Sequence, residues 1–302
     1  MASIVPATPL LTLNNGVTMR ALGLGVYQSA PDETVDAVQT ALTTGYRLID
    51  TAAAYGNERE VGEGIRRSGI DRSEVFLTTK LWISDYGYDE ALTGFDASLR
   101  RLGTDQVDLY LLHWPMPNEF ERTVGAWKAA ERILADGRAR AIGMCNCSPA
   151  HLDSLIEHTE IVPAVNQVEL HPYFSQQNVR DADSARGIIT QSWSPIGGVY
   201  VYQPNDPDNV RSVLQDETVA AIAAQHGKTP AQDVLRWQLQ HGLSPIPKSV
   251  KADRIAENFD VFDFELTPEQ VARIDRLDTG QRGGPDPEAV DTALFPFAIH
   301  NS

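Results

Sequence analysis

The sequence predicts an α/β fold, a closed (β/α)8 TIM barrel, and three observations support this fold class. Short β-branched runs alternate with amphipathic helical windows along the chain, as expected for parallel βα units. Eight such runs occur, and eight strands close an α/β barrel. The length of 302 residues leaves room for a barrel of roughly 250 residues with a few additions. No linker or repeat interrupts the pattern, so residues 1–302 are predicted to form a single domain.

The individual elements follow from the local sequence. An N-terminal β-hairpin is predicted because residues 11–13 and 17–19 flank Asn15-Gly16, a pair that favours tight turns. The eight barrel strands are predicted at 21–24, 47–50, 75–80, 107–113, 139–144, 164–168, 188–193 and 244–247. The helices that alternate with them are predicted at 33–43, 58–67, 89–101, 123–135, 149–158, 177–185, 231–240 and 252–258. Two extra helices are predicted at 213–225 and 268–277, followed by a C-terminal loop over the barrel mouth with an apolar patch at 294–297.

Charge and composition exclude several classes of function. The chain carries 25 Lys and Arg against 41 Asp and Glu, a net charge of −16, so it lacks the basic face that nucleic acid or an acidic membrane requires. No run approaches the ~18 apolar residues of a membrane span, and the first residues lack the basic region and cleavage site of a secretory signal. The only cysteines, Cys145 and Cys147, are too few for a disulfide framework. We therefore predict a reduced, soluble, cytoplasmic protein.

Four polar residues lie at or just after predicted strand ends, which meet at one mouth of a barrel. Asp50, Lys80 and His113 each end a strand, and Tyr55 follows Asp50 by five residues. Taken singly, each has an ordinary structural explanation: a helix cap, a packed ring or a lysine whose stem is buried. Taken together, they form a site that polarises and protonates a carbonyl. Asp50 would pair with the buried lysine, the ammonium would lower the pKa of the Tyr55 phenol, and His113 would orient the carbonyl oxygen.

Segment 246–254 is the strongest anion-binding signal. It joins the last strand to a helix start, where free backbone N–H groups favour phosphate, and barrels often bind phosphate after strands 7 and 8. Three cations, Lys248, Lys251 and Arg254, gather there in an otherwise acidic chain. The alternative is a solvated helix start.

Two glycine motifs and the cysteine pair are weaker signals. Gln28 stands where a dinucleotide fingerprint after Gly23 would have its third glycine. Gly227-Lys228-Thr229 lacks the first glycine of a P-loop and is better explained as a boundary between two helices. The two cysteines have no further ligands at metal spacing, so no metal is predicted.

The chain resembles the aldo-keto reductase superfamily over almost its whole length. Seven matching stretches carry the resemblance, namely LGLGVY (22–27), RLIDTA with YGNE (47–58), TKLW (79–82), LLHWP (111–115), NQVE (166–169), SPIG (194–197) and IPKS (246–249). Within the superfamily the sequence is most similar to prokaryotic reductases of small aldehydes and diketo sugars, such as 2,5-diketogluconate reductase.

The resemblance implies NADPH-dependent reduction of aldehydes and reactive ketones or diketones, usually by a monomer. It implies that Tyr55 is the general acid, tuned by Lys80 and Asp50, while His113 orients the substrate. The implied cofactor-binding residues are Val26, Cys145, Asn146, Gln167, Trp193, Ser194, Ile196, Lys248, Ser249, Val250, Arg254, Glu257 and Asn258. Of these, Asn146 and Gln167 would hold the carboxamide and Trp193 would stack on the nicotinamide. The adenosine 2′-phosphate would be bound by Lys248, Ser249 and Arg254. The implied substrate wall comprises Tyr27, Trp82 and Trp114 with His113, helped by the apolar tail.

Three positions depart from the family pattern. Cys145 replaces a common serine, Cys147 a common phenylalanine and Trp193 a common tyrosine. A thiol is a weaker donor than a hydroxyl, and inert packing of both cysteines is favoured over redox sensing. Two other functions remain as alternatives: a nucleotide-binding module without turnover, and a hydrolytic barrel that uses Asp50 with Glu58 or Glu169.

Overall fold

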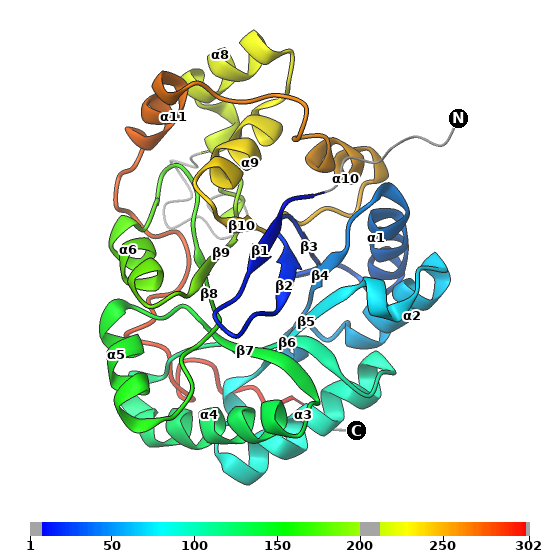
Figure 1. The fold of residues 1–302 in the computed structure, drawn as a ribbon, viewed down its shortest axis with the longest axis vertical. Coiled ribbons are helices and arrows are strands. Elements are labelled where there is room, and N and C mark those ends of the chain that lie inside the picture. The colour runs from blue at the N-terminus through cyan, green and yellow to red at the C-terminus, as the bar shows by residue number, and fades with distance from the viewer. Residues whose placement is uncertain (1–7, 200–211, 300–302) are drawn as a thin grey trace.

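Eight parallel strands form the centre of the computed structural model, which describes residues 8–199 and 212–299 (Figure 1). The strands are β3 (Leu24–Gly25), β4 (Leu48–Asp50), β5 (Phe76–Leu81), β6 (Val107–Leu112), β7 (Ala139–Cys145), β8 (Val165–Glu169), β9 (Ile189–Trp193) and β10 (Ser244–Pro245). Each strand pairs with the next one along the chain. The amides of Gly23 and Gly25 donate to the carbonyls of Pro245 and Pro247, both at 3.1 Å. These bonds bring the two edge strands together and close the barrel.

Helices surround the strands on the outside of the ring (Figure 1). They are α1 (Pro31–Thr44), α2 (Glu58–Ser68), α3 (Tyr88–Leu102), α4 (Phe120–Ala135), α5 (Pro149–His158), α6 (Gln177–Ala185), α8 (Glu217–His226), α9 (Pro230–Gln240), α10 (Ala252–Phe259) and α11 (Pro268–Asp275). The prediction of one helix over 213–225 is wrong at its start. A short 3-10 turn (Val213–Gln215) precedes α8, because the Asp216 side chain accepts from the amides of Thr218 and Val219 and so caps a new helix.

The first and last barrel strands are also shorter than predicted. The hairpin strand β2 (Thr18–Arg20) occupies the residues just before 21–24, and the amide of Ala21 still bonds back to the carbonyl of Pro9. Strand β10 ends early because the prolines at 245 and 247 have no N–H for a ladder. A Cβ on Gly25 would lie 2.9 Å from the Ile246 carbonyl oxygen, so the closure needs glycine there.

The predicted hairpin closes one end of the barrel. Strand β1 (Leu10–Thr12) pairs antiparallel with β2, and the side chains of Leu13 and Met19 are buried against Leu48 at the start of β4. The tip of the hairpin is held by Asn14, whose amide donates to the Pro163 carbonyl just before β8 at 2.9 Å. The hairpin therefore covers the amino-terminal end of the barrel and leaves the carboxyl ends of the strands for a site. Within the described residues, no helix is long and apolar enough to cross a membrane.

Candidate active site

Lys80 is buried at the carboxyl end of β5 among groups that stabilise its charge. Its Nζ donates to Asp50 Oδ1 at 2.6 Å and to the Thr51 carbonyl at 2.9 Å, and it lies 3.2 Å from Tyr55 Oη. The side chains of Lys80 and Asp50 are 0% and 1% exposed. Burial is the largest single effect and lowers the pKa of Lys80, but the Asp50 carboxylate, together with Tyr55 and Cys145, outweighs it, so the pKa is raised above its ordinary value. The lysine therefore remains an ammonium directed at the tyrosine.

Tyr55 lies on a short turn that the following residues hold in place. It ends the 3-10 turn Ala53–Tyr55, and Asn57 then donates to the Val26 carbonyl at 2.9 Å and accepts from Thr51 Oγ1 at 2.9 Å. Burial raises the pKa of Tyr55, and the Lys80 charge only partly opposes this rise. The ammonium lowers the pKa as predicted, but the net shift is upward, since desolvation outweighs the ammonium. The phenol is protonated at neutral pH, as a proton donor must be.

His113 follows β6 and faces the same cavity. Its ring packs edge-on against Tyr55 at a centroid distance of 5.7 Å and against Trp82 at 5.2 Å. Burial, with a smaller contribution from Lys80, holds the pKa of His113 well below its ordinary value, so the imidazole is neutral. Its Nδ1 has no hydrogen-bond partner among the residues that the structure describes. A neutral imidazole here can hydrogen-bond a carbonyl oxygen without carrying a competing charge.

These groups lie at one cavity of about 530 Å³ at the barrel mouth. Most of the predicted site residues line it: Tyr27, Asp50, Tyr55, Trp82, His113, Trp114, Cys145, Asn146, Gln167, Trp193, Ser194, Ile196 and Lys248. The C-terminal segment completes the wall, because Phe297 stacks on Trp82 at a centroid distance of 4.7 Å and its carbonyl accepts from Trp82 Nε1 at 3.2 Å. Phe295 and Phe297 both line the cavity, so the predicted loop over the mouth is present.

Polar side chains continue from Asp50 across the barrel interior. Gln167 donates to Asp50 Oδ2 at 2.7 Å and also reaches Gln191 Oε1 at 2.7 Å, and Gln191 in turn donates to Ser244 at 3.1 Å. Sequence reasoning did not identify Gln191 or Ser244. Both are polar residues in predicted barrel strands, and that position could have indicated that they point into the barrel interior. This chain of hydrogen bonds holds the Asp50 carboxylate through Oδ2, whereas Lys80 binds Oδ1.

The side of the cavity predicted to hold the nicotinamide is formed by Trp193 and Asn146. Trp193 Nε1 donates to Asn146 Oδ1 at 2.8 Å, and Asn146 Nδ2 donates to the His113 carbonyl at 3.1 Å. Asn146 and Ser194 both have positive φ, at 60° and 50°, conformations that follow directly on β7 and β9 and turn the chain at the mouth. The Ser194 Oγ accepts from the Val199 amide at 2.8 Å.

The predicted phosphate segment lies beside the mouth. Lys248 forms a parallel bridge with Gly25 and lines the cavity, whereas Ser249 is nearly buried and accepts from the Lys251 amide at 3.1 Å. Arg254 is exposed on α10. Within the described part of the chain, neither Lys248 nor Arg254 has an ion-pair or hydrogen-bond partner. Two uncompensated cations in a chain of net charge −16 fit a site that takes a phosphate.

Six predicted cofactor residues do not line the cavity: Val26, Ser249, Val250, Arg254, Glu257 and Asn258. Val26 is fully buried and meets the mouth only through its backbone, whose amide donates to the Asp50 carbonyl. Glu257 is already engaged by the Thr229 hydroxyl at 2.8 Å. The other four belong to the segment that runs from Lys248 into α10, outside the central hollow.

Both cysteines are free and buried, and burial raises the pKa of each thiol above its ordinary value. This supports the packing interpretation, because oxidation and metal binding both proceed through the thiolate. Among the described residues, no three His, Cys, Asp or Glu side chains form a group that could hold a metal ion.

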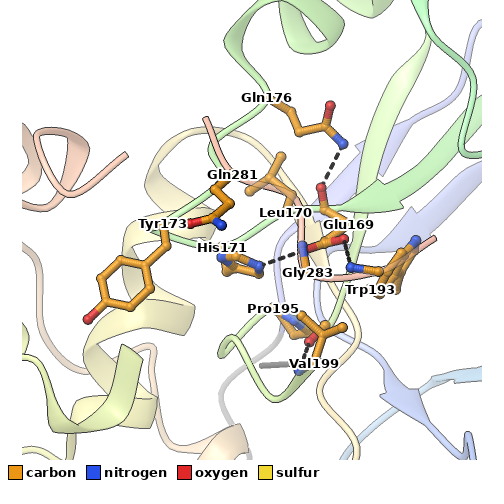
Figure 2. A network of polar contacts seen from close by, with 12 residues as sticks. Glu169, Leu170, His171, Tyr173, Gln176, Trp193, Pro195, Val199, Gln281 and Gly283 are labelled. Atoms are coloured by element: carbon orange, nitrogen blue, oxygen red, sulfur yellow. Dashed lines mark hydrogen bonds and ion pairs between the residues drawn. The ribbon is translucent and has the colours of Figure 1, made fainter. Parts of the chain in front are cut away.

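Glu58 and Glu169, the two carboxylates that the hydrolytic alternative requires, are both hydrogen-bonded to other parts of the protein. Glu58 accepts from Thr79 at 2.5 Å and from Arg101 at 2.6 Å, in a buried ion pair between α2 and α3. Glu169 accepts backbone amides of the C-terminal segment (Figure 2). Neither is free to act as a partner acid or base for Asp50, which argues against hydrolysis.

Comparison with known proteins agrees with this geometry. Residues 18–279 match the model of the Aldo/keto reductase family. Morphine 6-dehydrogenase of Pseudomonas putida is 54% identical over 291 residues, which cover 95% of this chain and 97% of that protein. Glyoxal reductase of Bacillus subtilis is 44% identical, covering 91% and 95%. Among solved structures, a variant of Gox0644 in complex with NADPH is similar, with a TM-score of 0.86, 41% identity and coverage of 94% and 99%.

Proposed function

The chain belongs to the aldo/keto reductase family, and on this premise we propose that it is an NADPH-dependent oxidoreductase that reduces aldehydes and reactive ketones to alcohols. One observation carries the proposal: a protonated Tyr55 phenol lies 3.2 Å from a buried ammonium in a cavity whose walls are aromatic. An acid held in this way is suited to protonating a carbonyl oxygen and to taking the proton back from an alcohol.

A reduced nicotinamide, when bound, supplies a hydride to the carbonyl carbon. The residues of the chain provide the rest of the chemistry. Tyr55 Oη delivers its proton to the carbonyl oxygen, and Lys80 stabilises the phenolate that remains, because its ammonium lies next to that oxygen. Asp50 keeps Lys80 charged. The neutral His113 ring hydrogen-bonds the same carbonyl oxygen and sets the face that it presents.

We propose that NADPH is held at two places. At the cavity, Asn146 and Gln167 would bind the carboxamide and Trp193 would stack on the ring, with backbone or side-chain contacts from Val26, Cys145, Ser194 and Ile196. Beside the mouth, the cations Lys248 and Arg254 would bind the 2′-phosphate, with Ser249, Val250, Glu257 and Asn258 around the adenosine. The two exposed cations without a protein partner support this assignment.

The aromatic wall favours flat, apolar carbonyl compounds. Tyr27, Trp82 and Trp114, with Phe295 and Phe297, offer ring faces and few polar groups on the substrate side. Relatives named for morphine oxidation and for glyoxal reduction span large and small substrates, so we propose a broad range that includes polycyclic alcohols in the oxidative direction. The closer relation to 2,5-diketogluconate reductase stays a prediction. A single domain over 1–302, a monomeric state and a cytoplasmic location likewise stay predictions.

Fluorescence titration with NADPH and NADH, followed by addition of a panel of aldehydes and ketones, tests the function. We expect tight NADPH binding, weaker NADH binding and loss of the reduced-nicotinamide absorbance when a carbonyl is added. Binding without turnover across the panel would favour a nucleotide-binding module instead. Failure to bind either nucleotide would contradict the cofactor assignment.

A further inference from the structure

Glu169 lies at the end of β8 as a fully buried carboxylate that the proposed chemistry does not use. Side chains two residues apart on a strand point to the same side, so Glu169 follows Gln167 toward the barrel mouth. Its Oε1 accepts from the Gly283 amide at 2.7 Å and lies 3.0 Å from His171 Nε2, and its Oε2 accepts from the Gly284 amide at 2.8 Å (Figure 2). The two oxygens of the Glu169 carboxylate thus accept from the successive amides of Gly283 and Gly284, which follow Glu169 by more than a hundred residues in the sequence.

Gly284 is required by the close approach of the two segments at this contact. A Cβ on Gly284 would lie 2.6 Å from Trp193 Cη2 and 3.0 Å from Glu169 Oε2. The segment is therefore pressed against the indole edge near the Nε1–H group, which donates to Asn146. Pro285, the next residue, already lines the cavity.

The segment then continues across the mouth to the substrate wall. Glu119 accepts from the amide and hydroxyl of Thr292 at 2.9 and 2.6 Å, and Phe297 stacks on Trp82. The Glu169 contact comes first along the segment and is the one that touches Trp193.

We propose that Glu169 is a positioning residue that fastens the C-terminal segment 283–299 to the barrel and so fixes both Trp193 and the aromatic wall. This inference rests on the proposed function for its kinetic part alone, because the attachment itself can be measured without turnover. It assigns Glu169 an effect on the binding of bulky substrates and, through Trp193, on the binding of NADPH, and none on the proton transfer at Tyr55.

The test is Glu169→Gln, with hydrogen–deuterium exchange of the peptides covering 283–299 and steady-state kinetics on two carbonyls. A carboxamide has one acceptor oxygen, so its NH₂ would face a glycine amide that also donates. One of the two hydrogen bonds is then replaced by a contact between two donors, which weakens the attachment. We expect exchange in 283–299 to rise at least about tenfold, an opening of the kind seen for locally unstable segments. At saturating NADPH, KM for a polycyclic ketone should rise by about as much, whereas KM for glyoxal and kcat for both substrates should change by less than about threefold.

Two further variants keep the test decisive. Asp183→Asn is the matched control, since Asp183 is equally buried but accepts from Asn166 and Thr190 on the barrel; it should leave exchange in 283–299 unchanged. Gly284→Ala keeps the carboxylate but places a methyl against Trp193, and it should reproduce the Glu169→Gln result if that variant fails to fold. Unchanged exchange in 283–299 would overturn the proposal, even if the protein reduced no carbonyl. Faster exchange with equal losses of kcat on both substrates would overturn it in favour of a general structural role.

Discussion

Replacing Tyr55 with phenylalanine removes the proposed proton donor and leaves the rest of the cavity in place. The ring of Tyr55 packs edge-on against Tyr27 at 5.1 Å and His113 at 5.7 Å, and phenylalanine preserves both contacts. What is lost is the hydroxyl 3.2 Å from Lys80 Nζ. General acid catalysis is typically worth 10²–10⁴-fold, or about 3–5 kcal/mol of barrier. We therefore expect Tyr55→Phe to lower turnover by at least about 10²-fold while NADPH still binds, because no predicted cofactor contact uses the hydroxyl.

The assay follows reduced-nicotinamide absorbance under single-turnover conditions, with NADPH affinity measured by fluorescence on the same protein. Tyr46→Phe is a suitable control, because Tyr46 is a fully buried phenol that does not line the cavity and donates to the Ile255 carbonyl at 3.1 Å. Its loss should cost about 1 kcal/mol of stability and change turnover by less than about threefold. Near-normal turnover in Tyr55→Phe would refute the assignment of the acid. An equal loss in both variants would mean that buried hydroxyls matter here for folding alone.

Two other predictions concern charge. Lys248→Ala and Arg254→Ala should each lower the preference for NADPH over NADH by about 10–100-fold, since a charge-assisted bond to the 2′-phosphate contributes roughly 1.5–3 kcal/mol. Lys128→Ala, at an exposed lysine on α4 away from this segment, is the control. An unchanged preference in the first two variants would contradict the phosphate assignment. Burial raises the pKa of Asp233 to about 7, and neither of its oxygens has a hydrogen-bond partner among the described residues. The folded state thus favours the protonated form, and stability falls as pH rises from the ordinary carboxyl range through 7. Asp233→Asn should therefore melt at least about 2 °C above the wild type at pH 8, with a smaller gain at pH 5, and a gain independent of pH would contradict this reasoning.

Local pattern was sufficient for the elements and for predicting that Asp50, Tyr55 and Lys80, the proposed acid-base groups, meet at one place. Alternating apolar runs gave strands within a few residues of those observed, because burial on both faces demands continuous apolar segments. The boundaries moved where a single residue decided them. Asp216 starts a new helix, and the prolines around β10 shorten that strand. Asp50 and Lys80 could be paired from sequence because parallel strands bring their carboxyl ends to one mouth, whatever the details of packing.

The sequence by itself therefore determined the barrel, the family resemblance and the meeting of Asp50, Tyr55 and Lys80 at one mouth. Only the tertiary structure decided the electrostatic balance, since the pKa of Tyr55 depends on how completely the surrounding atoms exclude water, and here burial outweighs the ammonium. The structure alone also revealed the attachment of Gly283 and Gly284 to Glu169. The local sequence does not predict that contact, because its donors are backbone amides, which every residue type except proline has. The partners are also separated by more than a hundred residues. Contacts of this kind arise when the chain folds back on itself, and they complete the wall of the cavity.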